Sequence, residues 1–148
     1  MGWRDVAKRL EELGKLRASV GWHDSAKYPD GTPVATAAVT QEFGSTKMNV
    51  PPRPMMRSTI GDQQKEWARQ AGLGFKAVAK GSRTPEQVIT ALGELAAGDV
   101  RMKISQITEP PLAEETQRRR KKLGYKPDKP LVRSGHMLAT CTSEIIKK

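Results

Sequence analysis

The side chains in this sequence that are best suited to catalysis form two short groups, His23-Asp24 and Ser134-Gly135-His136. A histidine beside a carboxylate can move protons, but no nucleophile accompanies this pair, and at the end of a predicted strand it is better explained as a turn cap. Ser134 lacks the Gly-x-Ser-x-Gly elbow of a serine hydrolase, and a helix N-cap explains it more simply. The sequence therefore predicts no catalytic site and no enzymatic activity.

Ligands for a metal or a cofactor are also scarce. The chain has two histidines and one cysteine, Cys141, at spacings that resemble neither a zinc site nor a haem site. Gly72-Leu73-Gly74 has the form of a phosphate loop, but it lies inside a predicted helix with no strand before it. There it indicates a close helix approach or a bend instead. We expect no metal and no cofactor, and the single cysteine fits assembly in a reducing cytoplasm.

A run of five basic side chains is the most distinctive charge feature. The net charge is +10, and more than half of the excess lies in residues 110–148. Glu114 and Glu115 precede the run, an order that suits the dipole of a helix over residues 112–123. The run is either the solvated end of that helix, or a contact for DNA phosphates or an acidic partner. With no interleaved aromatic residues, DNA contact would be salt-sensitive and sequence-independent. The candidate contacts are Arg118, Arg119, Arg120, Lys121 and Lys122.

Apolar periodicity predicts the elements at the start of the chain. Helical spacing favours a helix over residues 3–14, and alternation favours a half-buried strand over residues 16–23. Tyr28-Pro29-Asp30-Gly31 has the composition of a turn. Thr32-Pro33 then indicates the N-cap and first position of an alanine-rich helix over residues 34–43.

The rest of the chain predicts three longer or more polar helices and a last strand. The helices cover residues 54–81, 84–107 and 112–123, and the second opens on Thr84-Pro85-Glu86-Gln87, a capping box. β-Branched residues favour a strand over residues 139–146.

These elements predict an α+β fold. An isolated strand is not stable in water, so the early strand and the C-terminal strand are expected to pair as a small antiparallel sheet that packs with the helices. We assign residues 1–148 to a single domain and expect no transmembrane helix. Hydrophobic residues make up 36% of the chain, which predicts a small core. Either a subunit completed by its neighbours or a domain with long exposed loops would have this composition.

Two proline-rich segments interrupt the periodic pattern, at residues 44–53 and 124–133. Proline restricts the free chain, so a loop of this kind can dock on a neighbouring subunit at a low entropic cost. Methionines flank the first loop, and flexible thioethers suit either an adaptable interface or simple gap filling. The candidate inter-subunit residues are Met48, Val50, Pro51, Pro52, Arg53, Pro54 and Met55 in the first loop and Tyr125, Pro127 and Pro130 in the second.

An ordered set of short motifs covers most of the chain from about residue 17 to its end. They are Val20-Gly21-Trp22, Tyr28-Pro29-Asp30-Gly31-Thr32-Pro33-Val34-Ala35, Gln41-Glu42-Phe43-Gly44, Val50-Pro51-Pro52-Arg53-Pro54-Met55-Met56-Arg57, Pro110-Pro111-Leu112-Ala113, Lys129-Pro130-Leu131-Val132 and Ser134-Gly135-His136-Met137-Leu138. No single motif is specific. In this order they resemble the tail-completion, or virion morphogenesis, proteins of tailed bacteriophages.

The resemblance implies a small α+β structural subunit without a catalytic site. Such subunits form rings, usually hexameric, in the neck of the virion after assembly in the host cytoplasm. The ring completes or terminates the tail, contacts the tail tube and the adjacent neck or head-closure proteins, and lets genomic DNA pass through its lumen. Both a tail terminator and an adjacent neck component fit the motifs. The alternative is a free, non-specific DNA-binding protein that uses residues 118–122.

Overall fold

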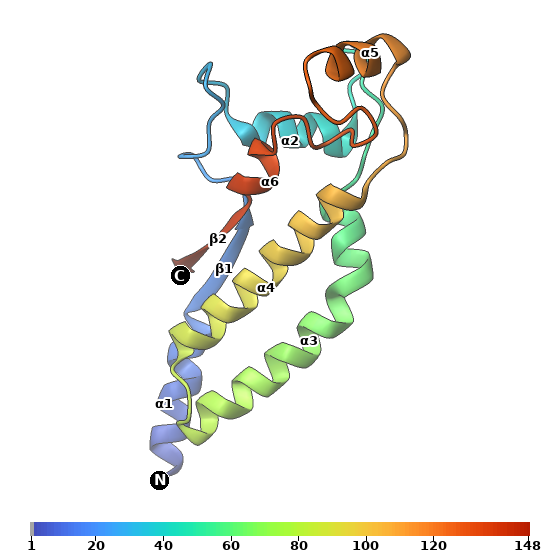
Figure 1. Cartoon of the computed structure of the whole chain (residues 1–148). Helices are drawn as coiled ribbons and strands as arrows, with labels where there is room; N and C mark the ends of the chain where they lie inside the picture. The colour runs from blue at the N-terminus through green and yellow to red at the C-terminus, as the bar shows by residue number, and fades with distance from the viewer. Residues whose placement is uncertain (1) are drawn as a thin grey trace. The chain divides into compact units, whose positions relative to one another are not determined.

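The computed structural model describes residues 2–148, and within this range the chain forms six helices and a two-stranded sheet. β1 and β2 lie side by side as an antiparallel pair (Figure 1), which confirms the α+β class and the pairing of an early strand with a C-terminal one. No helix in the described range is long and apolar enough to cross a membrane. The elements are α1 (Trp3–Gly14), β1 (Leu16–Gly21), α2 (Val34–Phe43), α3 (Met56–Lys80), α4 (Pro85–Gln106), α5 (Glu114–Lys122), α6 (His136–Thr140) and β2 (Thr142–Lys147).

The chain divides into two compact units, and each unit combines segments that are distant in the sequence. Helices α3 and α4 contribute residues to both. Unit 1 consists of the residues up to Val20, Asp62–Gly98 and Thr142–Lys148, and unit 2 consists of Gly21–Gly61 and Asp99–Cys141.

Unit 1 is organised around an apolar cluster between helices and sheet. Helices α3 and α4 approach closely at Gly74. A Cβ atom added there would lie only 2.5 Å from Cγ1 of Val88. The predicted capping box at the start of α4 is confirmed: Thr84 Oγ1 accepts from the Gln87 N–H, and Gln87 Oε1 accepts from the Thr84 N–H. The cluster consists of buried Leu13, Val78, Val88 and Ile89, with partly buried Leu16, Ala18 and Leu92 against it.

Unit 2 contains α2, α5, α6, both proline-rich loops and the ends of α3 and α4. Helix α6 packs beside α2 (Figure 1). The indole N–H of Trp22 donates to the carbonyl of Met137 over 2.8 Å, which ties the chain after β1 to α6. The buried apolar side chains of this unit are Val34, Ala38, Met55, Val100, Ile104, Leu131, Met137 and Cys141.

Two local predictions are wrong. The last strand begins at Thr142 rather than at residue 139, because the preceding residues complete α6, where the Thr140 hydroxyl donates to the His136 carbonyl over 2.7 Å. Thr32 does not cap α2. Pro33 occupies the N-cap position without a side-chain cap, and the Thr32 N–H donates instead to Asp30 Oδ1 over 2.9 Å.

Candidate functional site

The first proline-rich loop is a folded structure and not a free arm. The N–H of Ser45 and the N–H of Val50 each donate to the other residue's carbonyl, over 2.8 and 2.9 Å. Gly44 has φ +75°, and a Cβ there would lie 2.9 Å from the backbone N of Pro52, so only glycine fits this turn. The predicted loop therefore closes on itself directly after α2.

Arg53 joins this loop to the segment that precedes α5. Its side chain is only 3% exposed. Its Nε donates to the Pro110 carbonyl over 2.8 Å, and its Nη2 donates to the Pro111 carbonyl over 3.1 Å. Nη1 donates to Gln41 Oε1 over 3.1 Å. Burial lowers the pKa of Arg53, but a guanidinium stays protonated in proteins, so a buried charge holds three chain segments together.

Glu42, which precedes the loop, accepts hydrogen bonds from the residues that follow it. Its buried carboxylate accepts hydrogen bonds from the N–H groups of Met55, Met56 and Arg57, over 2.7, 2.9 and 3.1 Å, and from Arg57 Nε over 2.9 Å. These N–H groups begin α3, so the carboxylate serves as a cap supplied from α2. Burial alone raises the pKa of Glu42, but these hydrogen bonds outweigh it and the pKa is lowered.

A third charged side chain, Arg120, holds the second proline-rich loop. Its Nη1 donates to the carbonyl of Lys129 over 2.8 Å, and its Nη2 donates to the carbonyl of Pro130 over 3.0 Å. Burial lowers the pKa of Arg120, and the nearby charges of Arg133, Arg53 and Arg119 lower it further. Both loops lack regular secondary structure. Three charged side chains, Glu42, Arg53 and Arg120, instead bind backbone groups in them or beside them.

The predicted inter-subunit residues fall into two groups. Met48 is 65% exposed, and Pro51 and Pro52 are also exposed, so these side chains are available to a neighbour. Arg53 and Met55, by contrast, are buried inside the chain. The remaining candidates are intermediate or covered: Val50, Pro54, Tyr125 and Pro127 are half-buried and Pro130 is buried.

The five basic residues of α5 also separate. Arg118 pairs with Glu114 over 3.4 Å, and both side chains are more than four-fifths exposed. Arg120 is half-buried and engaged by the second loop. Arg119, Lys121 and Lys122 are exposed, and α5 has no buried residue. The basic side chains of α5 that a polyanion could reach are therefore Arg118, Arg119, Lys121 and Lys122, and not Arg120.

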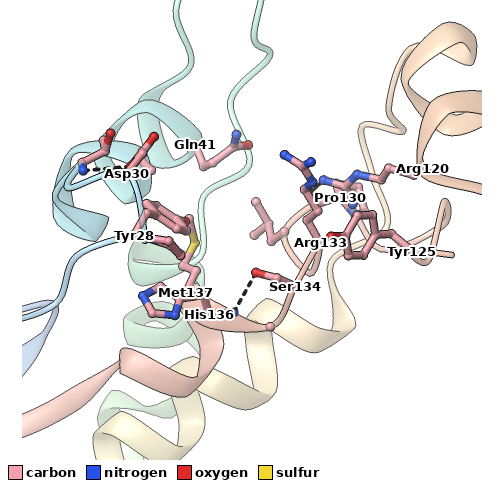
Figure 2. A pocket seen from close by; sticks show the side chains of 15 residues that line it. Tyr28, Asp30, Gln41, Arg120, Tyr125, Pro130, Arg133, Ser134, His136 and Met137 are labelled. Carbon is pink, nitrogen blue, oxygen red and sulfur yellow. Dashed lines mark hydrogen bonds between the residues drawn. The ribbon is translucent and has the colours of Figure 1, made fainter. Parts of the chain in front are cut away.

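A hollow of about 540 Å³ lies between α2 with its preceding turn and the segment from α5 to α6 (Figure 2). Tyr28 and His136 stack at one side of it, with ring centroids 5.1 Å apart, and His136 Nε2 donates to the Lys27 carbonyl over 2.7 Å. Arg120 and Arg133 enter from the other side. Sequence reasoning missed this hollow because four short segments line it, and nothing in any one of them shows that the fold brings the four together.

The structure describes the surroundings of Ser134, one of the residues considered for catalysis, and of Cys141. The predicted N-cap role of Ser134 is wrong, because Gly135 holds the N-cap position of α6 without a side-chain cap. Ser134 Oγ accepts from the His136 N–H at 3.4 Å. Cys141 is buried, and this burial raises the pKa of its thiol to about 11, so it is a poor nucleophile. Among residues 2–148 there is no cluster of three or more His, Cys, Asp and Glu side chains that could hold a metal ion.

Comparison of the chain with protein-family models, with curated proteins and with solved structures gave no match. The function must therefore be argued from the motifs and from the geometry of the two loops.

Proposed function

We propose that this chain is a structural subunit of a ring at the head–tail interface of a tailed-phage virion, where it completes the tail and joins it to the head. The ordered motifs are the first support. Two of them, at residues 41–44 and 50–57, meet in the buried contacts of Glu42 and Arg53. Their residues hold a loop in one shape, which is the task expected of motifs in a family of assembly proteins rather than enzymes.

One observation carries the proposal: the end of α2 and the firmly held loop after it each present a large apolar side chain to solvent. Phe43 is 63% exposed and Met48 is 65% exposed, although Glu42 and Arg53 fix the chain on both sides of them. A pre-organised loop loses little entropy when it binds, and exposed apolar side chains gain free energy when a neighbour covers them. Both properties favour a surface that binds a protein.

The same loop forms one wall of a groove of about 1000 Å³. The opposite wall consists of Pro111, Leu112, Ala113 and Thr116, before and at the start of α5. We assign this groove to a second copy of the chain, since a ring of identical subunits repeats one contact between two different surfaces. The adjacent tail tube and head-closure proteins would then contact the faces that the ring leaves open.

The direct test is the oligomeric state of the purified protein, measured by native mass spectrometry over a range of concentrations. We expect one closed oligomer for the wild type and a dissociation constant at least about tenfold higher for M48E, which corresponds to about 1.4 kcal/mol. M102E is the matched control, because Met102 is 59% exposed but does not line the groove. Equal dissociation of both variants would rule out the loop as the interface, and a wild type that stays monomeric alone and with tail tubes would overturn the ring.

Virions supply the second test. In the phage that encodes the chain, mass spectrometry of purified particles should detect it, and its absence would end the proposal. Electron microscopy of a deletion mutant then separates the two neck roles. Unjoined heads and tails would identify a joining component, whereas abnormally long tails would identify a tail terminator.

The exposed cations of α5 favour one alternative, a free DNA-binding protein. The isolated monomer would then bind duplex DNA with an affinity that falls steeply as salt rises. A double charge reversal tests it best at Arg119 and Lys122, which are exposed, because Arg120 holds the second loop. Normal particle assembly together with a lost, salt-sensitive duplex affinity in that variant would favour the alternative over the ring.

A further inference from the structure

We propose that the hollow between α2 and the second proline-rich loop binds a carboxylate carried by a peptide segment of a protein partner. The hollow lies entirely within unit 2 and is distinct from the groove assigned above to a second copy. Gln41 lines both, but the two arginines that carry the inference, Arg120 and Arg133, do not line the groove. The inference therefore does not depend on the ring, and it concerns a different kind of partner.

Two like charges share this hollow, and neither is paired with the carboxylate of Asp30, which also lines it. Arg120 and Arg133 both line it, and within residues 2–148 neither forms an ion pair with a carboxylate. Asp30 is the acidic residue among those that line the hollow, and its Oδ1 already accepts the Thr32 N–H. The repulsion from Arg133 contributes to the lowered pKa of Arg120. A bound anion would relieve this repulsion.

Arg133 has the donors that such an anion needs. Its guanidinium lies over the ring of Tyr125, 5.2 Å from the centroid. Its N–H groups donate to no other residue that the structure describes, so they are available to a ligand. A planar guanidinium binds a carboxylate through two parallel hydrogen bonds, so the aromatic ring holds Arg133 in a form suited to this ligand.

Gln41 supplies a further donor on the opposite side (Figure 2). Its Oε1 accepts from Arg53 Nη1, which fixes the orientation of the amide. The amide NH₂ group has no acceptor among the described residues, and the side chain lines the hollow. Arg53 therefore orders a donor of the site without entering it.

The walls favour a peptide over a nucleic acid. Apolar and aromatic side chains share the hollow with the charges, and its volume lies within the range of sites that enclose a ligand. A carboxylate with an adjacent apolar side chain would use both features, whereas a duplex backbone offers phosphates but no apolar group. The apolar and aromatic lining residues are Tyr28, Pro29, Tyr125, Pro130, Leu131 and Met137.

The experiment measures binding of a fluorescent peptide of glutamates around a single phenylalanine to the full-length protein, by anisotropy at fixed salt. R133Q should raise the dissociation constant of the peptide about tenfold. R133K should recover only part of the loss, because an ammonium group cannot form two parallel hydrogen bonds in one plane with a carboxylate. R118Q is the matched control, since it removes the same charge from an exposed helix position. We expect it to change the dissociation constant by about twofold or less.

Several results would overturn the inference. The first is that the glutamate peptide does not bind, and the second is that R118Q weakens binding as much as R133Q does. The third is that a short DNA duplex loses about tenfold affinity in R133Q while the peptide does not bind, which would make the hollow a phosphate site. A peptide with glutamine in place of glutamate must bind weakly, since otherwise the apolar walls alone hold it. Native mass spectrometry of M48E checks the ring separately, so failure of either proposal is recognised without the other.

Discussion

Both units bury apolar side chains, but unit 2 adds buried charged side chains that tie its segments together. In unit 1 the described core consists of aliphatic side chains, and helices approach where glycine leaves room, as at Gly74 beside Val88. In unit 2 the main ties between segments are charged side chains, Glu42, Arg53 and Arg120, that bind backbone groups of the loops.

This difference follows from the secondary structure that each unit contains. Helices and strands satisfy their own backbone groups, so unit 1 needs mainly apolar burial. The proline-rich loops of unit 2 lack those regular bonds, and each carbonyl removed from water needs a donor. Long guanidinium side chains provide several donors at once. The loops of unit 2 are therefore stabilised by charged side chains that are buried or half-buried.

The comparison is tested most strongly at Arg53. R53M keeps the length and apolar stem of the side chain but removes its hydrogen bonds to the carbonyls of Pro110 and Pro111. Three hydrogen bonds to a charged group are then lost, those to the two carbonyls and that to Gln41 Oε1. At about 1.5 kcal/mol for each, we expect the free energy of unfolding to fall by about 4 kcal/mol. Urea unfolding followed by circular dichroism measures the loss, and hydrogen exchange locates it. Faster exchange should appear in α2 and the loops of unit 2 and not in the core of unit 1.

R118M is the control for this change, because Arg118 is exposed and its pair with Glu114 is a surface contact. Its effect should stay within about 0.5 kcal/mol. If R53M costs no more than R118M, buried charge does not hold the loop, and the contrast between the units is lost.

Glu42 should give the next largest effect. E42Q keeps the shape of the side chain but removes the charge that three N–H groups and Arg57 bind. Hydrogen bonds to a charged group are the stronger ones, so we expect a loss of about 3 kcal/mol at neutral pH. E114Q is the matched control, because the Glu114 side chain is 87% exposed, and it should be close to neutral in the same urea experiment.

The pH dependence of the free energy of unfolding tests the same role of Glu42. The pKa of Glu42 in the folded chain lies below its ordinary value of 4.5. Its stabilisation is therefore complete above that ordinary value and is lost as the pH falls through the lower, folded pKa. Wild-type protein should lose stability in acid below about pH 4.5, and E42Q should lose less over the same range. Identical acid profiles would show that the carboxylate is not a charged cap.

Periodicity and capping chemistry predicted most of the fold. The helix over residues 3–14 is confirmed at both bounds, and so is the helix over residues 34–43. The last strand was placed three residues early, because Thr140 and Cys141 favour a strand locally while the hydroxyl of Thr140 closes a helical turn in α6. Local propensity does not decide a boundary that a hydrogen bond can move.

The site was less predictable than the fold. Proline pairs marked the first loop, but nothing local to Arg53 distinguishes a buried tie from an exposed contact, because its acceptors are more than fifty residues away. Within one basic run, Arg118 is exposed and Arg120 is engaged. Only the tertiary fold separates these two arginines. The hollow was missed for the same reason, since its donors Gln41 and Arg133 belong to different elements.

The smallest expected effect concerns glycines of unit 1, where space rather than charge should decide stability. A Cβ at Gly93 in α4 would overlap Ser143 Oγ of β2 and lie 2.9 Å from Cβ of Ala18 in β1, so G93A should cost about 2 kcal/mol through overpacking. Gly72 in α3 has nothing within 4 Å of such a Cβ, and G72A should stabilise the protein by about 0.7 kcal/mol because alanine favours a helix. Thermal unfolding of the two variants measures opposite shifts from the same substitution. If G93A is as well tolerated as G72A, the helix does not rest on the sheet at Gly93, and unit 1 would need another explanation for its stability.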